Sequence, residues 1–144
     1  MVDLRRRKGI VILLWLWAFV IGCQREAFTA ERIKWKPYDE AIAEGKETGK
    51  PVFILFVSRG CPSCEQLEET LKDPEITRLL NEEFLPVRIE AERNPELILH
   101  FRVYGFPTMW FYRRGDLIGP VVGYLPCGHL RKLLLHVLGA GNSP

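Results

Sequence analysis

One stretch of the chain is apolar without interruption, and the neighbouring segments are arranged around it. Residues 52–57 have the sequence Val-Phe-Ile-Leu-Phe-Val and follow a Gly-Lys-Pro breaker. An apolar run of this length, rich in β-branched and aromatic side chains, predicts a short strand buried on both faces, as in a parallel sheet. A turn at 58–60 follows. Leu67 and Leu71, four residues apart, then predict a helix that begins at Cys61.

The periodicity of apolar residues predicts the remaining elements. Spacings of three and four residues indicate helices, and alternation indicates strands. The expected helices cover residues 37–48, 74–81, 95–104 and 129–138, and the expected strands cover residues 84–89, 109–112 and 117–122. A turn makes the last two strands antiparallel neighbours, and a Gly-Pro pair inside the second suits a sheet edge. The order, a helix followed by β-α-β-α-β-β-α, predicts the α/β fold class.

Composition agrees with one globular domain. The chain has 144 residues, of which 47% are apolar and 26% charged, the ordinary balance for a protein with one hydrophobic core. The formal net charge of +2 misleads, because residues 5–8 are all basic. From Cys23 to the end there are 16 basic and 17 acidic residues, a net charge of −1. The body of the chain has no basic excess, which argues against nucleic-acid binding.

The N-terminal segment has the order of a secretory signal, with basic residues at 5–8 and an apolar run at 10–21. The run has 12 residues, fewer than the roughly 20 that span a bilayer. It ends at residues 20–23, Val-Ile-Gly-Cys, which resemble a bacterial lipobox. In that class the chain is cut before the cysteine, which then carries lipid. We therefore expect a lipoprotein signal peptide at 1–22 and lipid attachment at Cys23.

Two alternatives for this segment stay open, an uncleaved membrane anchor and ordinary cleavage near Ala27 or Ala30. All three interpretations place the domain outside the cytoplasm, where disulfides persist. The expected location is the extracytoplasmic, periplasmic face of a bacterial cell envelope, with a lipid anchor in the membrane. The expected organisation is a signal peptide at 1–22, a tether at 23–34, a domain at 35–138 and a tail at 139–144.

Cys61 and Cys64 form a C-x-x-C motif at the junction of the predicted strand and helix. Cys61 would occupy the N-cap, with Pro62 at the first helical position, where its missing N–H costs nothing. The free N–H groups and the positive end of the helix dipole favour thiolate over thiol. Cys64, one turn further and less exposed, is placed to attack a mixed disulfide formed at Cys61. The motif therefore predicts thiol–disulfide exchange.

Zinc binding and a purely structural disulfide are the alternatives for this motif. A C-x-x-C is often half of a zinc site, but the remaining cysteines, Cys23 and Cys127, do not form a second such pair. A disulfide between Cys61 and Cys64 closes a loop too short to constrain the unfolded chain strongly. Redox chemistry is favoured, no metal site is expected, and Cys127 is expected to be an incidental free thiol.

With these features in one order, the chain resembles the thioredoxin-like superfamily. Residues 105–108, Gly-Phe-Pro-Thr, resemble the Gly-x-Pro-Thr segment that carries the family's cis-proline, and 94–95 and Gly123 lie at the usual intervals around it. The resemblance covers about residues 51–138. It implies a central mixed sheet of about four strands flanked by helices, with an extra N-terminal helix here. Residues 35–52 look like the exported subgroup that includes the C-terminal domain of the membrane disulfide reductant DsbD.

The resemblance implies a role for each matching residue. Cys61 would be the attacking thiol and Cys64 the resolving thiol. Pro107, in a cis peptide bond, would face the C-x-x-C across a groove. The backbone of Phe106 would hydrogen-bond an extended substrate strand, and Phe106, Pro107 and Thr108 together are the expected substrate-binding residues. The Cys61–Cys64 disulfide is the redox group itself, so no separate cofactor is expected.

The chain departs from the thioredoxin pattern near its cysteines. Gly60 replaces the Trp that usually precedes the first cysteine, and Leu55 replaces a buried acid in the preceding strand. Arg88 lies near the position of the family lysine that pairs with that acid, so it is expected to be a strand-edge charge without this partner. Arg59 and Pro62 are the expected redox-tuning residues. The positive charge of Arg59 near the attacking thiol would lower its pKa. Pro62 occupies the first position between the cysteines, which resembles glutaredoxins and DsbA-like oxidants. A solvated turn residue is the alternative for Arg59.

The sequence thus predicts a membrane-anchored thiol–disulfide oxidoreductase that reduces or exchanges disulfides in exported proteins. Its expected partners are cysteine-containing exported proteins and a membrane electron donor of the DsbD type, and the chain is expected to be monomeric. A Cu(I)-binding chaperone that uses the same thiolates is the alternative, because soft thiolates suit Cu(I). Met109 is the nearest candidate for a further ligand. A non-catalytic scaffold that holds peptides is a third alternative, and the intact cysteines argue against it.

Overall fold

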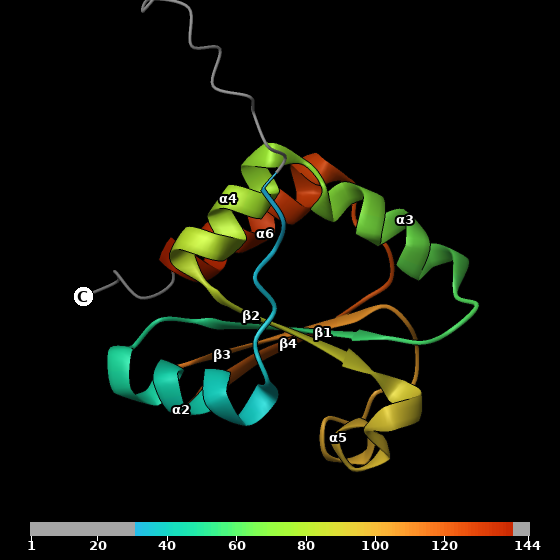
Figure 1. Cartoon of the computed structure of the whole chain (residues 1–144), viewed down its shortest axis with the longest axis horizontal. Coiled ribbons are helices and arrows are strands. Elements are labelled where there is room, and N and C mark those ends of the chain that lie inside the picture. Colours follow the sequence, from blue (N-terminus) through green and yellow to red (C-terminus); the bar gives the residue numbers. More distant parts are fainter. Residues whose placement is uncertain (1–30, 140–144) are drawn as a thin grey trace, which may run out of the picture.

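A four-stranded mixed sheet with helices on both faces forms the body of the molecule (Figure 1). The computed structural model describes residues 31–139. The strands are β1 (Val52–Val57), β2 (Leu85–Glu90), β3 (Thr108–Arg113) and β4 (Asp116–Val122). The helices are α2 (Tyr38–Thr48), α3 (Pro62–Leu71), α4 (Pro74–Glu83), α5 (Pro95–His100) and α6 (Cys127–Gly139), with a 3₁₀ turn η2 (Ala91–Arg93). The expected α/β class, the mixed sheet and the extra N-terminal helix, α2, are confirmed.

The apolar run at Val52–Val57 is the central strand of the sheet. The strand order is β2-β1-β3-β4, with β1 parallel to β2 and antiparallel to β3. All six residues of β1 are buried. Because side chains alternate along a strand, they supply two separate hydrophobic clusters, one on each face. Phe53, Leu55 and Val57 enter one cluster, and Val52, Ile54 and Phe56 enter the other.

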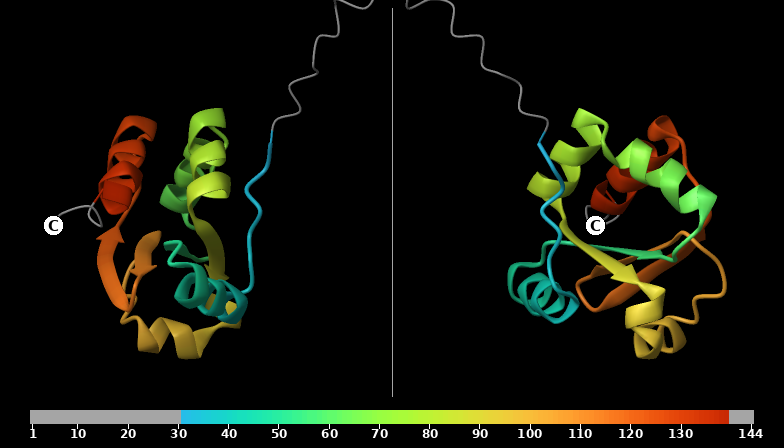
Figure 2. Two further views of the ribbon diagram at one scale, coloured as in Figure 1. Left: turned by 90° about the vertical axis from the view of Figure 1, so that its left-hand side faces the viewer. Right: turned by 45° about the vertical axis from the view of Figure 1, so that its right-hand side comes forward.

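The two faces of the sheet are covered by different helices. Helices α3, α4 and α6 lie on one face and α2 and α5 on the other (Figures 1 and 2). The first face is filled by residues such as Leu67, Leu80 and Leu134, and the second by residues such as Ala41 and Phe101. This arrangement places the N-terminus of α3 at the end of the central strand, where the C-x-x-C lies.

The predicted helices after β1 are two separate helices. Asp73 caps α4 by accepting hydrogen bonds from the N–H groups of Glu75 and Ile76, at 3.0 and 3.1 Å. Pro74 occupies the first turn of α4, where it lacks only a hydrogen bond that would be unmade anyway. The Thr77 hydroxyl donates to the Leu71 carbonyl oxygen at 2.8 Å and joins the two helices. Helix α3 therefore ends at Leu71, and α4 begins three residues later at Pro74, with Asp73 as its N-cap.

The helix expected between residues 95 and 104 is shorter in the structure. Helix α5 ends at His100, and Arg102 has a φ of 51°, a left-handed conformation that cannot continue an α-helix. Phe101 and Val103 still enter the second hydrophobic cluster. Their apolar spacing therefore reflects packing of a loop against the sheet. Sequence periodicity does not distinguish that packing from a helix.

Strand β4 is the edge strand that the Gly-Pro pair suggested. The Gly119–Pro120 peptide bond is cis, and the pairing of β3 with β4 shifts register between Met109 and Phe111. Strand β4 begins at Asp116, one residue before the prediction. Helix α6 begins at Cys127, two residues earlier than predicted.

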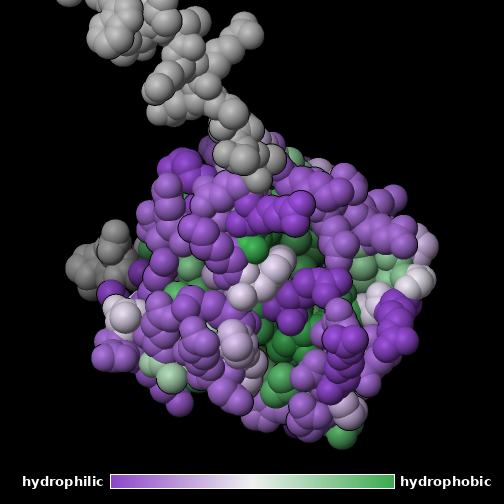
Figure 3. Space-filling view, in the orientation of Figure 1, coloured by the Kyte–Doolittle hydropathy of each residue, from purple (hydrophilic) through white to green (hydrophobic). Residues whose placement is uncertain are grey.

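Residues 31–36 form a strap that runs over α4 and along β2. The Lys34 N–H donates to Asn81 Oδ1 at 2.9 Å, and the Lys36 N–H donates to the Pro86 carbonyl oxygen at 2.8 Å. The Trp35 ring stacks on Phe53, with centroids 6.4 Å apart. Hydrophobic side chains are visible in hollows beside the strap (Figure 3). Residues 31–34, which the sequence assigned to the tether, are therefore packed on the domain.

Several sequence predictions fall on residues that the structure does not describe. The signal peptide at 1–22, the lipid-attachment residue Cys23 and the tail beyond residue 139 lie outside residues 31–139. Within the described part of the chain, none of the helices has the length and apolar character needed to cross a bilayer.

Candidate active site

The C-x-x-C lies at the N-terminus of α3, as the sequence indicated. Cys61 is the N-cap residue, with extended backbone angles (φ −101°, ψ 103°), and Pro62 follows at the first helical position. The Cys64 N–H donates to Cys61 Sγ at 3.2 Å. The helix dipole and this N–H both favour negative charge on the Cys61 sulfur when the disulfide is reduced.

Cys61 and Cys64 form a disulfide in the structure, with Cα atoms 5.2 Å apart. Cys61 is half-buried, whereas Cys64 has an exposed fraction of 4%. An incoming sulfur therefore reaches Cys61 more easily than Cys64. This difference in access is the one that an attacking and a resolving cysteine require.

The segment around Pro107 lies beside the C-x-x-C. The Phe106–Pro107 peptide bond is cis. The Thr108 hydroxyl donates to the Gly105 carbonyl oxygen at 2.7 Å, and the Gly123 N–H donates to the Pro107 carbonyl oxygen at 2.7 Å. The first bond braces the segment before β3 internally, and the second ties it to the loop after β4. The structure thus holds Phe106, Pro107 and Thr108 in one braced segment, in which Thr108 is buried. Their role in substrate binding stays a prediction.

Ser63, which the sequence reasoning did not single out, links the two halves of the site. Its hydroxyl donates to the Phe106 carbonyl oxygen at 3.1 Å and lies 3.4 Å from Cys61 Sγ. Ser63 is half-buried and comes from the first turn of α3. A hydroxyl between the two cysteines was a visible signal, but its second partner is 43 residues away in the sequence.

Glu92 is a second residue of the site that the sequence did not reveal. One of its carboxylate oxygens, Oε1, accepts hydrogen bonds from the Arg59 N–H at 2.8 Å and from the Ser58 hydroxyl at 2.7 Å. These bonds, the one from the Arg59 backbone foremost, lower the pKa of the Glu92 carboxyl to about 2. Glu92 belongs to η2, so it ties that turn to the loop that leads from β1 into the C-x-x-C.

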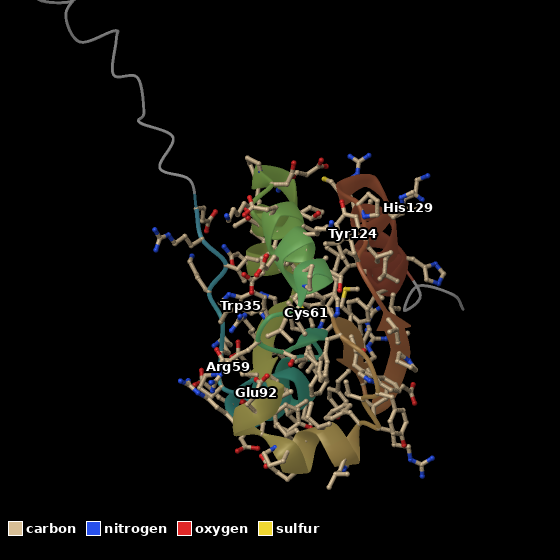
Figure 4. The ribbon with its side chains drawn as sticks, turned by 90° about the vertical axis from the view of Figure 1, so that its right-hand side faces the viewer. Trp35, Arg59, Cys61, Glu92, Tyr124 and His129 are labelled. Carbon is tan, nitrogen blue, oxygen red and sulfur yellow. A yellow bond between two sulfur atoms is a disulfide. The ribbon has the colours of Figure 1, made fainter. Side chains whose placement is uncertain are left out.

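The Arg59 side chain is exposed. Figure 4 shows Arg59 and Glu92 together on one side of Cys61, with Tyr124 on the other side. The positive charge of Arg59 also contributes to the lowered pKa of the Glu92 carboxyl. A neighbouring carboxylate of opposite sign weakens the field of Arg59 at the Cys61 sulfur. Redox tuning by Arg59 and Pro62 stays a prediction.

Arg88 lies on β2, an edge strand of the sheet, as expected, and it has acidic partners that the sequence did not reveal. Its guanidinium contacts Glu68 of α3 at 2.8 Å and Glu90 of β2 at 2.9 Å. Leu55, at the position where the family has a buried acid, is fully buried in the core. The actual partners are an acid on the active-site helix and an acid two residues along the strand, which form an ion-pair network on the protein surface.

Cys127 and Met109 are the other two sulfur-containing residues of the described domain. Cys127 is a half-buried free thiol at the start of α6, and burial together with the Asp73 charge raises its pKa. A thiol with a raised pKa is a poor nucleophile near neutral pH. Met109 is fully buried in the cluster beneath α3 and α6. Within residues 31–139, no three His, Cys, Asp or Glu side chains are grouped to hold a metal ion.

Known proteins share the fold of this chain. A family model described as a thioredoxin-like domain matches residues 38–138. A solved thioredoxin from Thermus thermophilus superposes with a TM-score of 0.68 at 31% sequence identity, covering 78% of this chain and 92% of that one. A solved oxidoreductase named DsbH superposes with a TM-score of 0.64 at 20% identity, covering 78% and 89% of the two chains. At that identity the likeness concerns the fold alone.

Sequence relatives cover different shares of their own lengths. Thioredoxin 1 of Chlorobaculum tepidum is 24% identical over 89 residues, which are 62% of this chain and 86% of that protein. Mouse spermatogenesis-associated protein 20 is 34% identical over 67 residues, 45% of this chain but only 8% of that much longer protein. The family model covers residues 38–138, which include both cysteines of the C-x-x-C. The chain therefore belongs to the thioredoxin-like family, and Cys61 and Cys64 are its C-x-x-C redox pair.

Proposed function

We propose that this chain is an extracytoplasmic, membrane-anchored thiol–disulfide oxidoreductase that reduces or exchanges disulfides in exported proteins. The observation that carries the proposal is the Cys61–Cys64 disulfide at the N-terminus of α3, beside the cis Phe106–Pro107 bond. An accessible sulfur at a helix N-terminus, a buried second sulfur and an adjacent backbone segment are the parts that disulfide exchange with a polypeptide needs.

The reaction has two exchange steps. The reduced Cys61 thiolate attacks a substrate disulfide, forms a mixed disulfide and releases one substrate thiolate. The Cys64 thiolate then attacks Cys61 Sγ, which forms the Cys61–Cys64 disulfide and releases the second substrate thiolate. The substrate gains two electrons and this protein loses two, so a dithiol donor must restore the reduced form. We assign that task to a membrane protein of the DsbD type.

The membrane anchor and the location rest on the sequence. The basic cluster at 5–8, the apolar run at 10–21 and the lipobox-like residues 20–23 support lipid attachment at Cys23 in a bacterial envelope. The wild-type protein should incorporate labelled fatty acid in a bacterial host, and Cys23→Ala, which lacks the acceptor sulfur, should not. A wild-type protein that stays in the membrane fraction without label would instead support an uncleaved anchor.

The test of the catalytic proposal is a mixed-disulfide trap. Cys64→Ala leaves Cys61 without its resolving thiol, so covalent complexes with exported proteins should accumulate and disappear on treatment with dithiothreitol. The variant is made in a Cys127→Ala background, because Cys127 is a second free thiol of the described domain. The matched control adds Cys61→Ala and should trap nothing. Equal recovery with and without Cys61, or no complexes at all, would refute the exchange mechanism.

A further inference from the structure

The Ser63 hydroxyl has one proton to donate, and two acceptors lie within its reach. Its oxygen lies 3.1 Å from the Phe106 carbonyl oxygen and 3.4 Å from Cys61 Sγ. A serine hydroxyl can donate only one hydrogen bond at a time. With Cys61 in a disulfide, its sulfur has no proton and is a weak, neutral acceptor. The carbonyl oxygen is the better acceptor in this state, and the Ser63 hydroxyl donates to it in the structure.

Reduction changes which acceptor is stronger. The Cys61 thiolate carries a full negative charge, and hydrogen bonds to an ionised acceptor are roughly twice as strong as those between neutral groups. The sulfur already lies within reach of the hydroxyl, so a rotation about the Ser63 side-chain torsions is enough to redirect the proton. The Phe106 carbonyl oxygen then loses its donor from α3.

We propose that the Ser63 hydroxyl is a redox-linked donor, which bonds the Phe106 carbonyl oxygen in the disulfide state and turns to the Cys61 thiolate in the reduced state. This inference rests on the proposed function and deepens it. In the reduced protein the free Phe106 carbonyl accepts a backbone N–H from an extended, disulfide-containing peptide. When the Cys61–Cys64 disulfide forms again, Ser63 returns to that carbonyl and weakens the hold on the reduced product.

Other groups also act on the Cys61 sulfur, and the test must keep them constant. The Cys64 N–H already donates to it, and the charges of Arg59, Glu65 and Glu92 come from the preceding loop, from α3 and from η2. None of these changes when only Ser63 is substituted. Ser63→Ala removes the hydroxyl, and Ser63→Thr keeps it. Thr70→Ala is the matched control, because Thr70 lies on the same helix and its hydroxyl bonds a backbone carbonyl remote from the cysteines.

The first readout is the pKa of the Cys61 thiol in the reduced full-length protein and its variants, followed by thiolate absorbance against pH. Losing a hydrogen bond to a charged acceptor should raise this pKa by about one unit in Ser63→Ala, which is a tenfold loss of thiolate below the pKa. Ser63→Thr should restore the wild-type pKa, and Thr70→Ala should leave it unchanged. An unchanged pKa in Ser63→Ala would overturn the proposal.

The second readout follows the carbonyl directly. The chain contains one Phe–Pro pair, so ¹³C-carbonyl phenylalanine with ¹⁵N proline gives a single directly coupled signal from Phe106. In wild type and Ser63→Thr this carbonyl shift should change on reduction by dithiothreitol, and in Ser63→Ala most of the change should vanish. No redox response in the wild type, or the full response in Ser63→Ala, would overturn the proposal.

These readouts need no substrate, so they separate two kinds of failure. A wild-type protein that shows both effects but reduces no peptide disulfide would leave the hydroxyl switch intact and overturn the proposed function. A protein that reduces peptide disulfides but shows neither effect would retain the function and overturn the role of Ser63.

Discussion

At the scale of single residues, the polar groups around Cys61 and the loop before it come from three separate segments. Helix α3 supplies the Cys64 N–H and the Ser63 hydroxyl, the loop before β3 supplies the Phe106 carbonyl, and η2 supplies the Glu92 carboxylate. Glu92 holds the loop before Cys61 through two donors. Because that loop leads into α3, the carboxylate helps to position Cys61.

The lowered pKa of Glu92 predicts a pH-dependent contribution to stability. A carboxyl whose pKa falls from 4.5 to about 2 on folding stabilises the folded state above pH 4.5, and this contribution is lost as the pH falls toward 2. Glu92→Gln should therefore lower the free energy of unfolding near neutral pH, and the difference from wild type should shrink between pH 4.5 and 2. Urea denaturation across that range measures it.

Glu96→Gln, at an exposed position on the neighbouring helix α5, is the control and should leave stability nearly unchanged. A deficit in Glu92→Gln that stays constant down to pH 2 would mean that the ionised carboxylate is not the stabilising group.

At the scale of elements, helix α2 shows how packing overrides helix propensity. Gly45 lies in the middle of α2 and is buried, although glycine costs about 1 kcal/mol relative to alanine in a helix interior. A Cβ at this position would lie 2.9 Å from Val52 Cγ2 and 3.2 Å from the Lys50 carbonyl oxygen. The helix therefore approaches the start of the central strand closely at this point, and only glycine fits there without displacement.

Gly45→Ala should consequently destabilise the protein, by about 1–3 kcal/mol from overpacking, despite the better helix former. The matched control is Gly128→Ala in α6, where a Cβ would meet no atom within 4 Å. That change should be neutral or stabilising by up to about 1 kcal/mol. Thermal and urea unfolding measure the change in stability of the two variants. A stabilised Gly45→Ala would show that α2 can move away from β1.

At the scale of the whole molecule, the strap adds a segment to a fold whose sheet already has helices on both faces. Trp35 stacks on Phe53 of the central strand, and Ile33 packs against the same hydrophobic cluster. Asn81 of α4 donates to the Arg32 carbonyl oxygen at 3.0 Å and accepts from the Lys34 N–H. The strap therefore contacts α4, β1 and β2, although it precedes all three in the sequence.

Trp35→Ala should lower the free energy of unfolding by about 1–3 kcal/mol, less than for a fully buried tryptophan because the side chain retains an exposed fraction of 37%. Leu99→Ala is the control, since Leu99 is a large apolar residue with an exposed fraction of 79% and should change stability by no more than about 0.5 kcal/mol. Equal effects of the two substitutions would mean that the strap contributes nothing to the folded body.

Local patterns were enough to predict most of the fold. The run at Val52–Val57, the N-cap and proline at the start of α3 and the spacing of leucines in α6 are short-range signals, and each led to the observed element. Periodicity failed where apolar residues packed without being helical, at Phe101 and Val103. It also gave no sign that residues 31–34 would pack on the domain, because a polar segment with a few apolar side chains has no regular period.

The sequence by itself determined the strand–C-x-x-C–helix unit, since the cap, the proline and the two cysteines are neighbours in the chain. It also marked the segment at Pro107 through a short motif. Only the tertiary structure decided which distant groups contact the C-x-x-C helix and the loop before it. Phe106 contacts Ser63, Glu92 contacts Ser58 and Glu68 contacts Arg88 across separations of 43, 34 and 20 residues. Contacts of that kind are set by how the sheet and helices pack, and no local pattern encodes them.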